Sequence, residues 1–261
     1  MQPGRTAGNL RLYTLEELKK VLNIALLKRN GYRISGLSKI HPKDMEAKVG
    51  LLSDDYDQWQ RAINDLTINM YTLDPESFEW VLDELLLAWP IEIMIEKIIF
   101  PFLKITNLLW IGHKLCEEHL VVAAIRKKLI LAIESVGFIP KADKTVLLFL
   151  PDTKQLDLGL LYGNYFLKKR GVHVLYMGND ITIQNLKSIF YVHPPTYIFT
   201  YLQQNHHFPI EQLLDCINLY AQYATLIIGG YSLEYATPIF SDNLIQMSYA
   251  EALEFLIAHC K

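Results

Sequence analysis

Short apolar runs alternate with amphipathic stretches through the second half of the chain. Apolar runs at 146–150 and 172–177 flank a segment, 158–169, whose apolar residues recur at helical spacing. The same unit then repeats, with strands expected at 196–200, 225–228 and 244–247 and helices at 182–191, 210–223 and 249–259. Strands that alternate with helices build a parallel sheet covered on both faces. The pattern predicts a doubly wound, flavodoxin-like α/β domain of five parallel strands over 142–261.

The segment before this domain, 53–138, is predicted to be helical. Four apolar-striped stretches with short connections are expected as helices at 56–71, 75–89, 91–109 and 116–136. Asp74 ahead of Pro75 is typical of a helix start, because the carboxylate accepts free backbone N–H groups and proline fits the first helical position. Short connections between such helices predict an antiparallel four-helix bundle.

Composition places the chain among globular proteins of a reducing compartment. With 261 residues, of which 51% are hydrophobic, it can bury the cores of two or three packed units. Charged residues interrupt the longest apolar runs, so no membrane span is expected, and the first residues lack the apolar core of a secretory signal. The scattered Cys116, Cys216 and Cys260 favour the cytoplasm.

Basic residues concentrate at the amino-terminal end. The first fifty residues hold ten Lys and Arg against four Asp and Glu. This density suits contact with nucleic-acid phosphates, although a lysine-rich solvated helix face has the same composition. Thr14, with Glu17 three residues later, predicts a capping box for a helix that ends at Gly31. A second, short helix is expected at 34–40.

The order RTAGNLRLY, a capped helix and a short helix resembles the second half of a MerR-type winged-helix DNA-binding domain, over 1–52. The resemblance implies that Arg5, Arg11 and Tyr13 form a basic wing that contacts the DNA backbone, which positions a protein without reading bases. In that family a helix-turn-helix reads the bases and precedes this part. We therefore expect a shortened chain, with DNA as a partner only of a longer form. Self-association into a homo-oligomer is also implied.

The stretch KTVLLFLPDTKQLDLGLLYGNYFLKKRGVHVLYMGND, at 144–180, resembles a cobalamin-binding domain. The helical segment before it resembles the cap of light-sensing cobalamin-dependent repressors. In that cap a Trp, nine further residues and then Glu-His cover the upper face of the cofactor. Trp110, Glu118 and His119 match by type, with seven intervening residues instead of nine. The resemblance thus makes these three candidate cofactor-binding residues.

The lower face departs from the family. Cobalamin domains of this type carry Asp-x-His-x-x-Gly, in which the histidine coordinates cobalt and the aspartate orients its imidazole. Here Lys154 and Leu156 replace the pair, and Gly159 alone is retained. Leucine has no lone pair for a metal, so coordination by a protein histidine at this position is excluded. Cobalamin is therefore implied by resemblance, while the residues favour no cofactor.

Other positions match the family more closely. Thr200 and Leu202 follow its Ser-x-Leu, and Gly229 and Gly230 follow its Gly-Gly, where missing side chains make room for the nucleotide tail of the cofactor. The helix at 158–169 carries large side chains that are expected to fill part of the groove for that tail. They are Tyr162, Tyr165 and Phe166.

No catalytic motif is present in the sequence. It has no nucleophile elbow, no glycine-rich phosphate loop and no carboxylate pair at a spacing suited to acid–base work. His113, Cys116 and His119 recur every three residues, but no paired motif supplies further ligands, so a metal site is not expected. A non-enzyme is predicted.

Three functions remain open at this point. The preferred hypothesis is a MerR-type regulator whose degenerate cobalamin-binding fold senses another ligand or serves in assembly. The second is a cobalamin sensor that holds the cofactor with its own base still on cobalt, or through His119. The third is a corrinoid carrier for methyl transfer, which the missing lower histidine disfavours.

Overall fold

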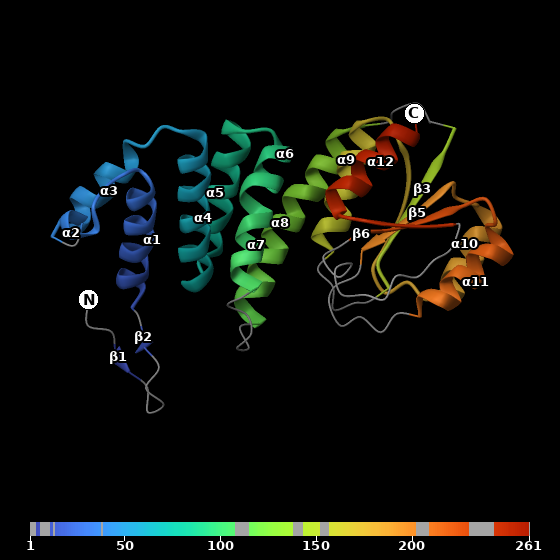
Figure 1. Ribbon diagram of the computed structural model, residues 1–261, viewed down its shortest axis with the longest axis horizontal. Coiled ribbons are helices and arrows are strands. Elements are labelled where there is room, and N and C mark those ends of the chain that lie inside the picture. Colours follow the sequence, from blue (N-terminus) through green and yellow to red (C-terminus); the bar gives the residue numbers. More distant parts are fainter. Residues whose placement is uncertain are drawn as a thin grey trace. The chain divides into compact units, whose positions relative to one another are not determined.

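A computed structural model of the chain describes residues 4–5, 11–12, 14–37, 39–107, 115–137, 143–151, 157–201, 209–229 and 243–260 (Figure 1). The chain divides into two compact units, Met1–Ala124 and Ile125–Lys261. Helix α8, Leu115–Ser135, contributes residues to both units. In the described residues no helix combines the length and apolar character needed to cross a membrane.

The first unit opens with a small hairpin and three helices. Strands β1 (Gly4–Arg5) and β2 (Arg11–Leu12) pair antiparallel, with Arg5 opposite Arg11. The helices that follow are α1 (Leu15–Arg29), α2 (Ile34–Leu37) and α3 (Pro42–Gly50). The predicted capping box is confirmed, because the Thr14 hydroxyl accepts from the Glu17 N–H and the Glu17 carboxylate accepts from the Thr14 N–H.

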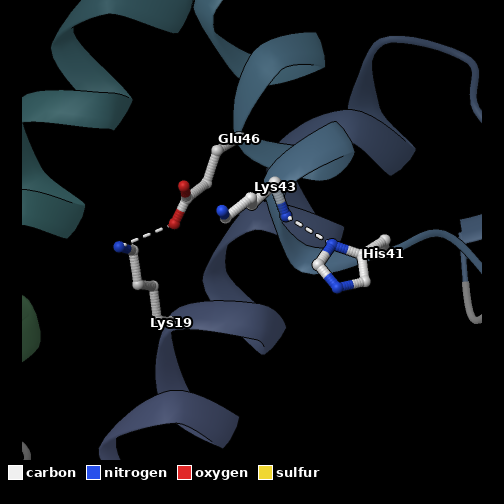
Figure 2. A network of polar contacts seen from close by, with 4 residues as sticks. All are labelled: Lys19, His41, Lys43 and Glu46. Atoms are coloured by element: carbon white, nitrogen blue, oxygen red, sulfur yellow. Dashed lines mark hydrogen bonds and ion pairs between the residues drawn. The ribbon is translucent and has the colours of Figure 1, made fainter.

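Helices α1 to α3 share a small core of their own. It is formed by Leu26, Leu27, Leu37, Met45 and Val49. On the surface, Lys19 Nζ lies 2.7 Å from Glu46 Oε1, and His41 Nδ1 accepts the N–H of Lys43 at the start of α3 (Figure 2). The hydrogen bond to Glu46 raises the pKa of Lys19, so this link between α1 and α3 is charged at neutral pH.

The remaining helices of this unit follow the predicted bounds closely. They are α4 (Asp55–Tyr71), α5 (Pro75–Ala88), α6 (Ile91–Ile93), η1 (Met94–Ile99), α7 (Phe100–Asn107) and the first part of α8. Asp74 caps α5 by accepting the Ser77 N–H, as predicted. The π-helical stretch η1 interrupts the helix expected at 91–109, and nothing in the hydrophobic pattern indicated it. Buried rings of Phe78 and Phe102 lie 6.0 Å apart in the core.

The second unit contains the predicted five-stranded parallel sheet. Its strands are β3 (Thr145–Phe149), β4 (His173–Gly178), β5 (Tyr197–Tyr201), β6 (Thr225–Gly229) and β7 (Leu244–Met247), in the order β4-β3-β5-β6-β7. This is the flavodoxin-like order, in which the first strand lies inside the sheet and the connections leave it in both directions. The predicted five-stranded parallel sheet is confirmed.

Helices cover both faces of the sheet (Figure 1). On one face lie α10 (Ile183–Val192) and α11 (Ile210–Tyr220), which enclose a core with Leu147, Ile198 and Leu226 of the strands. On the other face lie α9 (Leu158–Lys169) and α12 (Tyr249–His259). The rings of Tyr197 and Phe255 meet edge to face there at 5.9 Å. Successive side chains along each strand therefore point to opposite faces of the sheet. In the central strands β3, β5 and β6 both sets are largely buried, as expected for a parallel sheet covered on both sides.

Candidate functional site

The fold places its ligand position at the carboxyl ends of the central strands. In an open α/β sheet, ligands bind where the strand order reverses, which here is between β3 and β5. Helix α9 begins next to this edge, and β5 and β6 end there at Tyr201 and Gly229. Leu156, Leu202 and Gly230 lie outside the described residues. The residues described at or near this edge are Gly159, Thr200, Tyr201 and Gly229.

Thr200 and Gly229 lie on opposite faces of the sheet. Thr200 is paired in register with Ile228, whose side chain belongs to the core under α10 and α11. Tyr201 is paired with Gly229, and both face α9 and α12. Thr200 is fully buried, and its hydroxyl oxygen has no hydrogen-bond partner among the described residues. The structure thus does not bring Thr200 together with the two glycines of the predicted site.

The space that Gly159 leaves is occupied by Tyr201. A Cβ atom on Gly159 would lie 3.2 Å from Cε1, Cζ and Oη of the Tyr201 ring. Burial raises the pKa of Tyr201 well above its ordinary value, and the Asp157 carboxylate adds to the rise, while hydrogen bonds to the backbone of Leu160 and Gly159 oppose it. Tyr201 is therefore a neutral phenol held against the first turn of α9.

Tyr249 fills the neighbouring space. Its hydroxyl donates to the carbonyl oxygen of Gly159 at 2.5 Å, and its ring lies 5.9 Å from the rings of both Phe199 and Tyr201. A Cβ on Gly229 would lie 3.0 Å from the Phe199 ring and 3.3 Å from the Tyr249 Cα. Phe199, Tyr201 and Tyr249 form what we name the aromatic cluster. It occupies the room that both glycines leave.

Helix α9 adds further rings on the same face of the sheet. The rings of Tyr162 and Phe166 lie 5.7 Å apart and those of Tyr162 and Tyr165 6.4 Å apart, and all three side chains are buried. Gly163, between them, has the Tyr249 hydroxyl 3.4 Å from the position of a Cβ. The described side of the sheet is packed with the chain's own aromatic residues. A planar base inserted beside these glycines would have to displace them.

An ion pair lies at the start of α9. Asp157 Oδ1 lies 2.6 Å from Nη2 of Arg126, which comes from the part of α8 in the second unit. Desolvation raises the pKa of the nearby Tyr176 to about 12, and the Asp157 charge contributes to that rise. Sequence reasoning missed Arg126, Asp157, Tyr201 and Tyr249. They are distant from one another in the chain, and no motif marks them.

The remaining predicted residues belong to the first unit. Glu118 is half-buried and His119 exposed on α8, whereas Trp110 lies outside the described residues. Arg5 and Arg11 are on the paired strands of the hairpin, and Tyr13 is outside the described part. No group of three or more His, Cys, Asp or Glu residues that could hold a metal ion occurs in the part of the chain that the structure describes.

Comparison with known proteins gives a match at the level of fold. No protein-family model matches the chain, and no curated protein matches it either. Among solved structures, the monomethylamine corrinoid protein of Methanosarcina barkeri superposes with a TM-score of 0.61 at 15% identity, over 76% of this chain and 98% of that one. The chain therefore carries a cobalamin-binding-like fold with a five-stranded parallel sheet.

Two further structures match more loosely. One is the methanol:cobalamin methyltransferase complex of Methanosarcina barkeri, with a TM-score of 0.39 at 13% identity over 87% of this chain and 93% of that one. The other is a cobalamin-binding protein from Desulfitobacterium hafniense DCB-2, with a TM-score of 0.33 at 12% identity. This match covers 74% of this chain and 96% of that one.

Proposed function

We propose that the chain is a non-catalytic regulator of the MerR type whose cobalamin-binding-like domain no longer binds cobalamin through a protein histidine. Its domain would act by sensing another ligand, by self-assembly, or by both. The observation that carries the proposal is the aromatic cluster, which fills the positions beside Gly159 and Gly229. The residues present on this face do not fit a nucleotide tail.

The lower coordination position supports the same conclusion independently. Leu156 stands where the resembling family has its cobalt-ligating histidine, and Lys154 stands where it has the orienting aspartate. Neither side chain can take over its counterpart's role, because leucine offers no lone pair and a protonated lysine cannot accept a hydrogen bond from an imidazole. Two separate features of the same domain thus oppose this mode of binding.

The amino-terminal hairpin supports a regulatory role in contact with DNA. Arg5 and Arg11 are register partners in the antiparallel β1–β2 pair, and the capped helix α1 follows in the chain. A short basic hairpin ahead of a helix is the order expected of a wing. In this proposal Arg5, Arg11 and Tyr13 contact phosphates, which positions the protein on DNA without reading bases.

A corrinoid carrier is the second candidate, since the monomethylamine corrinoid protein shares the fold. The proposed absence of histidine coordination disfavours it. Cobalamin held base-on, or through His119, remains as a further alternative, because His119 is exposed on α8. One binding experiment distinguishes all of these from the regulator without cobalamin.

The experiment mixes the protein in the dark with adenosylcobalamin, methylcobalamin and hydroxocobalamin in turn, followed by gel filtration and absorbance. We expect a colourless protein peak. Co-elution with a base-on spectrum would overturn the proposal in favour of a cobalamin sensor, and a spectrum altered by His119→Ala would assign coordination to that residue. Methyl transfer from the co-eluted cofactor to an acceptor would identify a carrier.

Variants separate the two obstacles to binding. Lys154→Asp with Leu156→His restores the coordinating pair, and Tyr201→Ala opens the aromatic cluster. We expect cobalamin with a histidine-coordinated spectrum only when all three changes are combined. Tyr223→Ala, which removes an exposed tyrosine, is the matched control for Tyr201→Ala. Binding by the Lys154→Asp and Leu156→His variant alone would show that the cluster is no obstacle.

Sequence-independent contact of the hairpin with DNA phosphates is tested by anisotropy of a labelled duplex at several salt concentrations. Each wing arginine that neutralises a phosphate contributes about 1 to the salt slope, so Arg5→Ala and Arg11→Ala should each lower it by about that amount. Arg170→Ala, an exposed arginine of the second unit, is the control. A slope unaffected by either wing variant would remove the hairpin from the proposal.

A further inference from the structure

A groove of about 580 Å³ lies in the first unit between α1, α4 and α7. Leu15, Leu18 and Leu22 of α1 form one wall, and Ile63 of α4 and Ile105 of α7 lie opposite. Leu15 and Ile105 are 40% and 41% exposed, so the groove leaves apolar surface open to solvent. Its volume is within the range of small-molecule sites.

Outside the groove, contacts at the carboxyl end of α1 hold this helix to α4. Asn30, which ends α1, donates to Asp57 Oδ1 near the start of α4 at 3.0 Å. The Arg29 guanidinium stacks at 3.2 Å over the Tyr56 ring. The groove runs along α1 from Leu15 to Leu22 and along α4 from Gln60 to Tyr71. Helices α1 and α4 are therefore in contact at the carboxyl end of α1, and the groove separates them nearer its amino end.

The lining defines the chemistry of a ligand. No charged side chain lines the groove among the described residues. Asn64 is only 5% exposed, and its Oδ1 lies 3.4 Å from Nε2 of Gln60. Burial, together with the Glu117 carboxylate, raises the pKa of Tyr71, whose hydroxyl is therefore neutral. The described lining itself offers a charged ligand no counter-charge to offset its lost hydration.

We propose that this groove is a binding site for an uncharged, mainly apolar small molecule that carries one or two hydrogen-bonding groups. Its apolar body would lie against the three leucines of α1. Its polar group would meet the amides of Gln60 and Asn64 or the hydroxyl of Tyr71. The site is in the first unit, so it is separate from the glycine positions of the sheet.

Occupation of the groove would act on the hairpin. A molecule between the open ends of α1 and α4 pushes on the amino end of α1, while the contacts of Asn30 and Arg29 hold its carboxyl end. Strand β2 ends at Leu12, directly ahead of the Thr14 cap. Movement of α1 therefore changes the position of the hairpin. This regulatory step rests on the proposed function, whereas binding itself does not.

The test uses N-phenyl-1-naphthylamine, an uncharged apolar fluorescent probe, with the full chain. We expect saturable binding, and Leu18→Trp, which fills the groove, should weaken it about tenfold or more. Leu87→Trp is the matched control, since Leu87 is 83% exposed on α5 and does not line the groove. It should leave the affinity unchanged. Hydrogen exchange with the probe bound should slow at the amides of α1 from Leu15 to Leu22 and of α4 from Gln60 to Tyr71.

The site would be overturned by absence of saturable binding, by equal effects of Leu18→Trp and Leu87→Trp, or by protection located elsewhere in the chain. If Leu18→Trp instead changes the mass of the particle in solution, the groove is an interface between copies of the chain, which also overturns the ligand site. Each outcome is independent of the cobalamin and DNA measurements, so failure here and failure of the proposed function can be told apart.

Discussion

The two units differ in whether the space beside a helix is filled by side chains or left open. In the second unit, the positions that a ligand-binding fold leaves open next to α9 are filled by Phe199, Tyr201 and Tyr249. In the first unit, α1 and α4 enclose an open groove lined by leucines and neutral polar groups. The capacity to take up a ligand thus lies, in our proposal, outside the position that the fold suggests.

The difference comes from the size of the residues that face each other. Glycines opposite aromatic rings give a tight fit, in which each ring enters the room that a missing side chain leaves. In the groove, the leucines of α1 lie opposite the amides of Gln60 and Asn64. The fit is loose there, because these side chains do not fill the space between the helices. The size of the facing residues can therefore close one surface and leave another open. Adding volume on each side tests the contrast directly.

The largest effect is expected from Gly229→Ala. Its new methyl group would lie 3.0 Å from the Phe199 ring and 3.3 Å from the backbone of Tyr249, which cannot easily move. We expect a loss of about 2–3 kcal/mol in the free energy of unfolding, as for other overpacked cores. Urea denaturation followed by circular dichroism measures it.

Gly163→Ala is the control for this effect. Its methyl group would meet only the Tyr249 hydroxyl at 3.4 Å and Leu253 at 3.5 Å, which are ordinary contacts. Alanine is also the better helix former by about 1 kcal/mol, so this variant should be as stable as the parent or more so. Equal losses for both glycines would mean that the close contacts at Gly229 are not the cause of its loss of stability.

The second prediction concerns alkaline pH. Burial raises the pKa of Tyr176 from 10.0 to about 12 and raises that of Tyr201 further. A group with a raised folded pKa contributes stability that is complete below its unfolded pKa and lost as pH rises towards the folded one. The free energy of unfolding should therefore fall as pH rises above 10, and less steeply in Tyr201→Phe. Tyr223→Phe, at an exposed position, should match the parent.

Local signals in the sequence predicted much of the fold. Thr14 with Glu17, and Asp74 with Pro75, mark helix starts through contacts within one turn, and both caps form. The strands of the second unit are short apolar runs, so their existence and parallel pairing followed from pattern alone. The π-helical stretch Met94–Ile99 was missed, because its apolar residues read equally well as an ordinary helix.

The candidate site depended on contacts that no local pattern contains. Tyr249 bonds to Gly159 across ninety positions of sequence, and Arg126 pairs with Asp157 across thirty-one. Gly159 and Gly229 were interpreted as positions that leave room for a cofactor. A glycine leaves such room only if no other side chain of the protein occupies it. Whether a ring from the same chain occupies that room depends on the three-dimensional register of β5 and α12.

A third prediction concerns the fastened end of α1. Asn30 donates to Leu26 O and to Asp57 Oδ1, and Asp57 is buried. Asn30→Ala leaves this carboxylate without one of its donors and should lower the free energy of unfolding by about 1–2 kcal/mol. Gln58→Ala removes an exposed side-chain bond to Ser53 O and should cost less. In a thermal melt, equal shifts for both variants would argue against the fastening role.

The smallest effect is expected from Leu22→Phe in the groove. The larger side chain extends into open space, so it should change the free energy of unfolding by no more than about 0.5 kcal/mol, and in the stabilising direction if the ring reaches Ile63. This outcome is the converse of Gly229→Ala, where a single methyl group is not tolerated. If Leu22→Phe instead destabilised the protein by as much as Gly229→Ala, the junction of α1 and α4 would be as tightly packed as the aromatic cluster. The contrast between the two units would then disappear, and with it the space for a ligand beside α1.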